Sequence, residues 1–126
     1  NTLLNSFGKA LCLDNENLIN VVTAISGSGP AYIFYLVEVL SKIGMNQGLS
    51  AESAKVLALE TLIGSAMLLE SSNIDPKILR QNVTSPGGTT EAGLEILASK
   101  KNGLFDLLNN TISCAKERAI YLNSNN

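Results

Sequence analysis

Apolar residues recur every three or four positions along most of this chain, which is the spacing of one face of a helix. This pattern predicts six helices, separated by polar or glycine-rich segments, over residues 16–25, 30–43, 51–71, 76–83, 91–101 and 104–121. Before them, residues 2–8 are typical of a helix that stops at Gly8, and residues 10–13 favour a short strand. The sequence therefore predicts an all-α fold, a multi-helix bundle in a single domain covering residues 1–126.

Residues typical of helix ends support several of these boundaries. Pro30 suits the first position of a helix, where its missing N–H has no cost. Ser50 and Asp75 suit the N-cap position, because their side chains accept hydrogen bonds from free backbone N–H groups. Residues 100–101 are both lysine and Gly103 follows them, which favours a helix that ends near residue 101.

The helix expected at 30–43 is apolar on nearly every face, which is typical of a helix that is buried on all sides. The helix expected at 51–71 carries small residues that would let another helix approach closely. Charged residues make up only 16% of the chain, against about a quarter in typical domains. We therefore expect a second subunit or a missing domain to cover much of the apolar surface.

Composition excludes several functions. The chain has no histidine, which rules out a catalytic histidine and any histidine-ligated metal, and no metal site is expected. The net charge is −2 without a basic run, so no nucleic-acid partner is expected. No apolar run is long enough to cross a membrane. Cys12 and Cys114 lie far apart in the sequence and are expected to be free buried thiols, which fits a cytoplasmic protein. The chain begins at Asn1 rather than Met, which indicates a fragment of something longer.

The segment 82–93 has the composition of a binding loop. It combines one proline and two adjacent glycines with four hydroxyl side chains: Pro86, Gly87, Gly88, Thr84, Ser85, Thr89 and Thr90. Thr89 or Thr90 would cap a helix that begins at Glu91. A glycine-rich turn at a helix N-terminus presents bare N–H groups and the positive end of the helix dipole, which suits a carboxylate or a phosphate. The alternative is an ordinary capped turn between two helices.

A second glycine-containing segment, 24–32, has glycines at positions 27 and 29 but not the third glycine of a dinucleotide-binding fingerprint. No clear strand precedes it, so by its spacing it is a kink between helices. Glu38 stands among valines and leucines of the next helix. It is either a partly buried carboxylate of the kind found at active sites or, more commonly, a residue on a solvated stripe.

Segments 24–32 and 79–94, with the helical stretch between them, resemble the C-terminal half of pyrroline-5-carboxylate reductase in both order and spacing. The resemblance covers roughly residues 3–122. It implies an oxidoreductase that reduces 1-pyrroline-5-carboxylate to L-proline with NADPH or NADH, the last step of proline biosynthesis. In this family an N-terminal Rossmann domain, which these residues do not resemble, binds the nucleotide. The helical domain interleaves with a second subunit as a homodimer, and some members assemble further into decamers.

The resemblance also implies roles for single residues. Ser85 matches a serine that contacts the substrate carboxylate, assisted by backbone N–H groups around Gly87, Gly88 and Thr89. Thr90 matches the hydroxyl placed near the ring nitrogen and is the expected catalytic residue. Two more residues, Ser26 and Gly27, match a segment that lines the cleft near the nicotinamide. An acidic residue of the family, upstream of the loop, has no clear counterpart here.

Two hypotheses follow. In the first, the chain is the substrate-binding and dimerisation domain of the reductase, and is inactive by itself. In the second, it is a non-catalytic homodimerisation module whose loop is only a capped turn.

Overall fold

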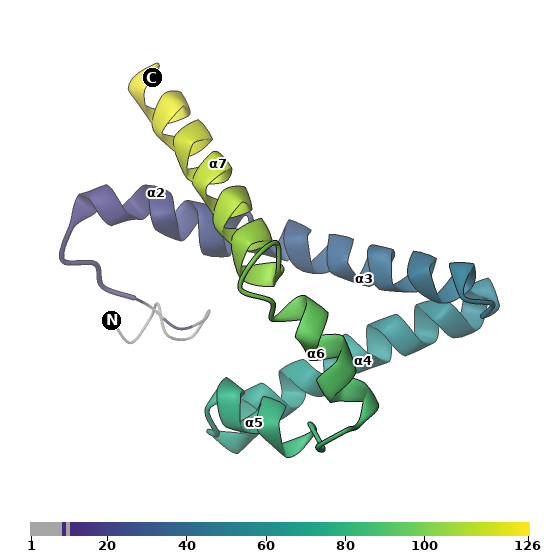
Figure 1. Cartoon of the computed structure of the whole chain (residues 1–126). Coiled ribbons are helices and arrows are strands. Elements are labelled where there is room, and N and C mark those ends of the chain that lie inside the picture. Colours follow the sequence, from purple (N-terminus) through teal and green to yellow (C-terminus); the bar gives the residue numbers. More distant parts are fainter. Residues whose placement is uncertain (1–8, 10) are drawn as a thin grey trace.

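The regular structure is helical throughout the described part of the chain. The computed structural model describes Lys9 and residues 11–126. The elements are a 3₁₀ turn η1, a short helix α2, a π-helical turn η2 and the helices α3 to α7: Glu16–Leu18, Ile19–Val22, Thr23–Gly27, Gly29–Asn46, Ala51–Ser72, Pro76–Asn82, Thr89–Leu97 and Leu104–Ser124 (Figure 1). The predicted all-α class is confirmed. The helix expected over residues 2–8 lies outside the described residues, and the expected strand is wrong for 11–13, which are irregular.

The first helical stretch ends within segment 26–29, as the sequence predicts: η2 ends at Gly27, Ser28 lies between the elements, and α3 begins at Gly29. Asn15 caps its start, where the side-chain oxygen accepts from the N–H of Asn17 at 2.9 Å. The backbone then widens into the π turn η2, and the N–H of Ser28 donates to the carbonyl of Thr23 at 2.9 Å. This five-residue step leads into α3, so η2 takes up the irregularity that the glycines indicated.

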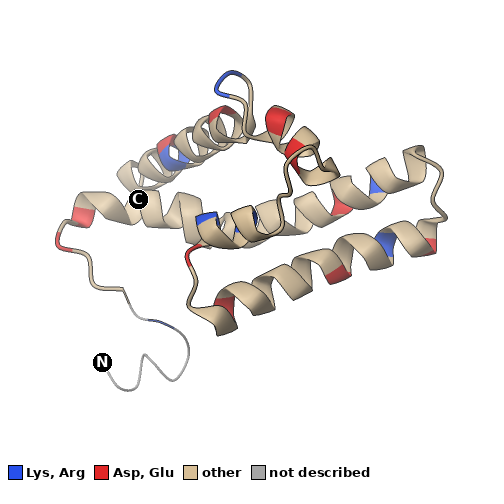
Figure 2. Cartoon of the chain, turned by 60° about the horizontal axis from the view of Figure 1, so that its bottom comes forward, with Lys and Arg blue, Asp and Glu red and all other residues tan. Residues whose placement is uncertain are grey.

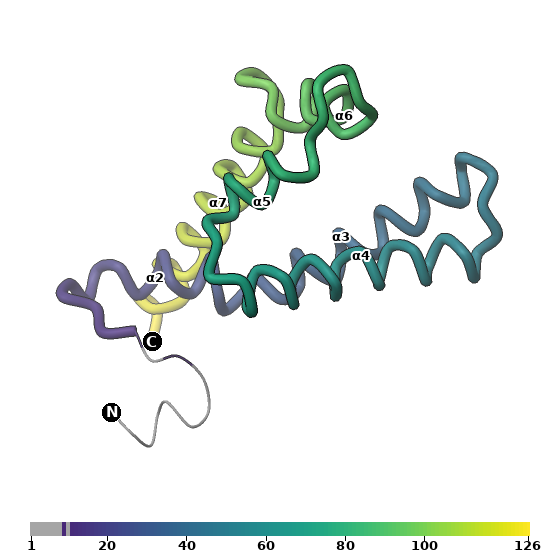
Figure 3. The backbone as a smooth tube through the Cα atoms, turned by 90° about the horizontal axis from the view of Figure 1, so that it is seen from below, coloured from purple at the N-terminus to yellow at the C-terminus, as the bar shows by residue number. Residues whose placement is uncertain are grey.

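Helices α3 and α4 lie side by side in opposite directions and form a long hairpin (Figure 3). Ser50 caps α4 as predicted, accepting from the N–H of Ser53 at 3.1 Å. Small residues allow the close approach, because Ala54 and Ala58 are buried and a methyl group on Gly44 would lie 3.1 Å from the Ala54 side chain. Part of the small-residue pattern on α4 is therefore used within the chain.

Helix α7 packs across η2 and α2, far from them in sequence (Figure 1). Ala24 of η2 is fully buried there. The side-chain amide of Asn123 donates to the side-chain oxygen of Asn20 at 2.8 Å. This contact holds the C-terminal end of the chain against its first described helix.

Helices α5 and α6 connect the hairpin to α7. Asp75 caps α5 as predicted, accepting from the N–H of Lys77 at 2.8 Å. The helix expected at 91–101 is instead Thr89–Leu97, and residues 100–101 lie in the link to α7. Gly103 is the N-cap of α7 and not a stop signal for α6. The prediction was therefore wrong for both residue types: the lysines lie in the turn between the helices, and the glycine belongs to the start of α7.

The chain has almost no interior of its own. Within the described residues only Ala24, Ala54 and Ala58 are buried apolar residues. The accessible surface is 10505 Å², whereas a compact monomer of this mass exposes about 6,500 Å². Helix α3, expected to be buried on all sides, leaves Phe34 71% exposed in the single chain. Charged residues make up 16% of the chain and are scattered along its helices and links (Figure 2), so most of this area belongs to uncharged residues.

Candidate substrate loop

The link between α5 and α6 folds into a tight turn over residues 85–88. The N–H of Gly88 donates to the carbonyl of Ser85 at 3.0 Å. Pro86 occupies the second position of the turn, and Gly87 occupies the third with a φ of 70°. A proline followed by a glycine of positive φ is the arrangement of a type II turn. The local sequence thus determines the shape of the loop.

Gly88, and not Thr89 or Thr90, is the N-cap of α6. A methyl group on Gly88 would clash with the hydroxyl oxygen of Ser85 and would lie 3.1 Å from the Ser85 carbonyl oxygen. The absence of a side chain at Gly88 therefore lets the Ser85 hydroxyl lie directly against the helix start. The predicted cap was wrong because the helix begins two residues earlier, and both threonines lie in its first turn.

Two of the expected bare N–H groups are already paired. The N–H of Gly88 closes the turn, and the N–H of Gly87 donates to Oε1 of Glu91 at 3.2 Å. Within the described residues, the backbone N–H groups of Thr89, Thr90 and Glu91 have no acceptor, as expected for the first turn of a helix without a side-chain cap. The donors that remain for an anion are thus in the first turn of α6, one to three residues beyond the glycines.

The hydroxyl groups of the loop also differ in whether they are already hydrogen-bonded within the chain. The Thr84 hydroxyl donates to the carbonyl of Arg80 at 2.6 Å, at the end of α5. The side chains of Ser85, Thr89 and Thr90 are exposed, and no hydrogen bond to another part of the described chain involves their hydroxyl groups. These three hydroxyls and the three free N–H groups surround the start of one helix.

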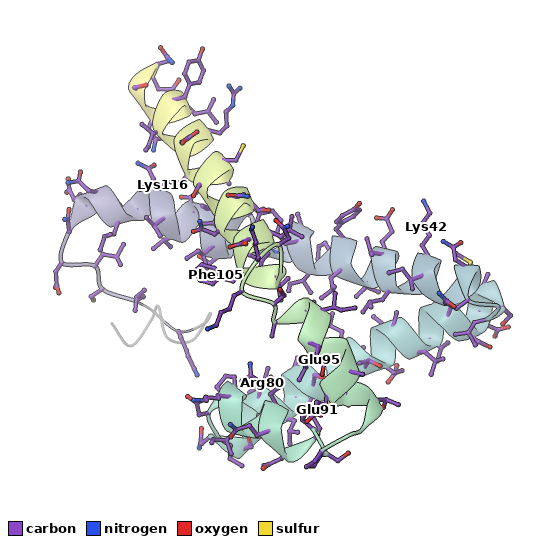
Figure 4. The ribbon with its side chains drawn as sticks, viewed as in Figure 1. Lys42, Arg80, Glu91, Glu95, Phe105 and Lys116 are labelled. Carbon is purple, nitrogen blue, oxygen red and sulfur yellow. The ribbon has the colours of Figure 1, made fainter. Side chains whose placement is uncertain are left out.

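Arg80 is a nearby cation that sequence reasoning did not single out. It lines a hollow of about 360 Å³ with Thr84, Glu91 and Glu95, and Figure 4 shows these charged side chains on neighbouring elements. It also lines an apolar hollow of about 600 Å³ between α6 and α7, next to Phe105. The sequence signal that could have identified Arg80 was its position four residues before Thr84.

Glu91 is the second residue that was missed. It is the third residue of α6 and lies three residues after the N-cap, the position from which a glutamate reaches back to the backbone before a helix. The sequence signal for this role was the three-residue spacing between Gly88 and Glu91, which becomes informative only when Gly88 is known to be the N-cap.

Ser26 and Gly27 lie in η2, away from the loop. The Ser26 hydroxyl donates to the carbonyl of Val22 at 2.8 Å, so it is used within the turn. Ser26 lines a mostly apolar hollow of about 470 Å³ with Tyr32, Pro30 and Ile112, and this hollow contains no residue of the loop. The described chain therefore does not bring the two expected parts of the site into one cavity.

Glu38 is exposed in the single chain, which agrees with the alternative of a residue on a solvated stripe and not with a partly buried carboxylate. Cys12 and Cys114 are free thiols, as expected, but both are exposed and not buried. Within residues 9 and 11–126, no cluster of three or more His, Cys, Asp or Glu residues is placed to hold a metal ion. None of the described helices is long and apolar enough to span a membrane.

The chain matches the family model for pyrroline-5-carboxylate reductase dimerisation over residues 16–122. A pyrroline-5-carboxylate reductase of Pseudomonas aeruginosa is 43% identical over 120 residues, which cover 95% of this chain and 43% of that protein. The pyrroline-5-carboxylate reductase of Arabidopsis thaliana is 41% identical over 114 residues, covering 90% of this chain and 41% of that protein.

Solved structures agree with these matches. A pyrroline-5-carboxylate reductase from Coxiella burnetii superposes with a TM-score of 0.86 at 36% identity, covering 96% of this chain and 44% of that one. A Plasmodium falciparum pyrroline carboxylate reductase with NADP bound gives a TM-score of 0.78 at 36% identity, covering 94% of this chain and 44% of that one. The chain spans less than half the length of these relatives. Because the family model matches most of the sequence, the chain belongs to the pyrroline-5-carboxylate reductase family and carries its dimerisation part.

Proposed function

We propose that this chain is the substrate-binding and dimer-forming part of an oxidoreductase that reduces 1-pyrroline-5-carboxylate to L-proline with NADPH or NADH, the last step of proline biosynthesis. The family match supports the reaction. The observation that carries the proposal in the structure is the start of α6, where three unpaired N–H groups lie beside three exposed hydroxyls. The substrate is a small anion, and such a helix start suits its carboxylate.

In this proposal the backbone N–H groups of Thr89 and Thr90, with the Ser85 hydroxyl, bind the substrate carboxylate. Gly87 and Gly88 contribute the shape of the turn, since their own N–H groups are engaged within the loop. The Thr90 hydroxyl donates to or accepts from the ring nitrogen and fixes the orientation of the ring. Orientation is the main requirement of such a reaction, because a reacting carbon must be held in line with its hydride donor.

NADPH or NADH, when bound, supplies the hydride. The hollow beside Ser26 fits the nicotinamide end of such a cofactor, because Pro30, Tyr32 and Ile112 give it a mostly apolar lining. No lysine or arginine lines it, so the phosphates of the cofactor require another part of the enzyme. Ser26 and Gly27 thus contribute the wall of this hollow and the turn behind it, and the loop of α6 completes the site from a different direction.

We also propose that two copies of the chain interleave as a homodimer, in which the second copy covers the exposed apolar faces of α3 and α4. Each chain exposes about 4,000 Å² more than a compact monomer of its mass, about 8,000 Å² for two copies, which is more than the roughly 2,000–5,000 Å² that obligate interfaces bury in total. Assembly of dimers into a decamer is an extension of the same proposal, and sedimentation of the purified protein separates the two sizes. The two free thiols support a reducing compartment such as the cytoplasm.

The test is an assay of the gene's full-length product for NADPH or NADH oxidation with 1-pyrroline-5-carboxylate. Titration of this chain with L-proline, followed through the amide signals of Thr89 and Thr90, tests the loop separately. Activity together with shifts at these amides is expected. A stable dimer that shows neither would support the non-catalytic homodimerisation module and contradict the proposal.

A further inference from the structure

The chain begins two of its helices in the same way. Both α6 and α7 have a glycine N-cap with extended backbone, Gly88 and Gly103, and neither cap has a side-chain hydrogen bond. A residue of positive φ precedes each cap: Gly87 at 70° and Asn102 at 59°. The two turns thus share a backbone form that ordinary side chains rarely adopt.

An acidic residue stabilises each of these turns from the same position. Oε1 of Glu91 accepts from the N–H of Gly87 at 3.2 Å, and Oδ2 of Asp106 accepts from the N–H of Asn102 at 2.8 Å. In both cases the acceptor lies four residues after the donor and three after the cap. Recurrence at two unrelated sequences indicates that this bond is a way of holding the positive-φ residue in place.

The two helix starts differ in their neighbouring side chains. The first turn of α6 begins with Thr89 and Thr90, whereas that of α7 begins with Leu104 and Phe105. Both Leu104 and Phe105 line the apolar hollow between α6 and α7. The start of α7 therefore has the same turn and the same acidic acceptor as the start of α6, but it lacks the hydroxyl groups of the proposed substrate loop.

We propose that Glu91 is a positioning residue of the substrate loop. Its carboxylate holds the Gly87 N–H, which fixes the 85–88 turn and keeps the Ser85 hydroxyl and the free N–H groups of α6 aimed at one point. This inference rests on the proposed function. Glu91 contacts the turn and not the substrate, so its effect passes through Gly87.

The alternative is that the Glu91 carboxylate weakens substrate binding. A negative charge in the first turn of α6 would repel the substrate carboxylate or compete with it for the Gly87 N–H. The Glu91 side chain is exposed, so solvent screens the repulsion, whereas the hydrogen bond to Gly87 requires only an oxygen acceptor. Glutamine keeps that acceptor and removes the charge, and alanine removes both, so these two substitutions separate the two actions.

The experiment compares Glu91→Ala and Glu91→Gln in the gene's full-length product, with Asp106→Ala as the matched control at the other helix start. We expect Glu91→Ala to raise the KM for 1-pyrroline-5-carboxylate about 3- to 10-fold, the effect of one lost hydrogen bond, with a smaller change in kcat. Glu91→Gln should restore KM to within about twofold of the wild type. Asp106→Ala should lower the Tm by a similar amount to Glu91→Ala and leave KM unchanged.

Amide hydrogen exchange provides a readout independent of catalysis. Exchange at Gly87 should accelerate in Glu91→Ala and stay near the wild-type rate in Glu91→Gln, while Asn102 responds only to Asp106→Ala. An active wild type whose KM is unchanged in Glu91→Ala would overturn the inference while the proposed function stands. A fall in KM in both Glu91 variants would overturn it in favour of repulsion. A wild type that neither reduces the imine nor binds L-proline would instead overturn the proposed function itself.

Discussion

Single residues around the loop differ in whether their polar groups are already hydrogen-bonded. Thr84 lies in the same hydroxyl-rich segment as Thr90, but its hydroxyl is held by the carbonyl of Arg80 at 2.6 Å. The Thr90 hydroxyl has no such partner in the described chain and is exposed. Thr90 is therefore free to bind a ligand, and Thr84 serves to end α5.

Removing the Thr90 hydroxyl should affect catalysis more than folding. We expect Thr90→Ala to lower kcat/KM in the full-length product about 10- to 100-fold, the effect of one or two lost hydrogen bonds in the transition state. Thr111→Ala is the control, because the Thr111 hydroxyl donates to the carbonyl of Leu107 within α7. Steady-state kinetics of both variants tests this, and unchanged kinetics in Thr90→Ala would remove the role assigned to Thr90.

At the scale of elements, the two glycine-capped helix starts differ in what surrounds their caps. An added methyl group at Gly88 would clash with a side-chain hydroxyl, that of Ser85, and would lie 3.1 Å from the Ser85 carbonyl oxygen. At Gly103 the same group would clash with the backbone carbonyl of Ser99 and would lie 3.0 Å from that of Leu97. The Ser85 hydroxyl can rotate away from the added methyl group. The backbone carbonyls of Leu97 and Ser99 can move only if the link between α6 and α7 changes its conformation.

Alanine at the two caps should therefore have different consequences. Gly103→Ala should lower the free energy of unfolding by about 3 kcal/mol, and Gly88→Ala by about 1 kcal/mol, since steric insertion into a packed position costs in this range. Gly88→Ala should in addition raise KM, because the Ser85 hydroxyl is displaced. Urea denaturation at equal protein concentration measures the first effect. Equal losses of stability would show that the backbone around Gly103 can adjust.

The helix boundaries show which local signals could be read from the sequence. Ser50 and Asp75 were assigned correctly as caps, because each has a side chain that bonds to its own helix start. Gly103 was misassigned, because a glycine after two lysines is typical of a helix C-terminus but suits an N-cap equally well. The composition of the loop could also be recognised in the sequence. The hydrogen bond from the Gly87 N–H to Glu91 could not be predicted, because it depends on a side-chain rotamer that no spacing rule specifies.

At the scale of the whole molecule, the hydrophobic pattern predicted burial that a single chain does not provide. Phe34 and Tyr35 lie on neighbouring positions of α3, and they are 71% and 63% exposed. Sequence reasoning could infer from the shortage of charge that something covers these residues. It could not say which faces are covered within the chain and which by a second copy, because that depends on how α3 packs on α4.

If folding and dimerisation are coupled, stability must depend on concentration. We expect the Tm to rise by about 2–4 °C for each tenfold increase in chain concentration, because dilution favours the separated, unfolded chains. Calorimetry over a hundredfold concentration range tests this. A Tm independent of concentration would show that the single chain is stable by itself despite its small interior, which would contradict the coupling of folding to dimerisation.

A charge on the apolar surface of α3 should prevent assembly. We expect Phe34→Asp to shift the protein from dimer to monomer and to lower its helical content. Glu38→Gln, on the same helix, is the control and should leave the dimer intact, because it changes charge without removing apolar contact area. Sedimentation velocity with circular dichroism measures both effects. A dimer unaffected by Phe34→Asp would place the partner on other helices.

The π turn η2 has a consequence for changes of chain length. A π turn contains about one residue more than an α turn, and one residue in a helix corresponds to about 100° of rotation. Deleting a single residue from Thr23–Gly27 would turn α3 by about 100° relative to α2, and therefore relative to α7, which packs on α2. The α3–α4 hairpin would keep its own packing but change its orientation relative to α7, so this short segment should tolerate substitutions far better than deletions.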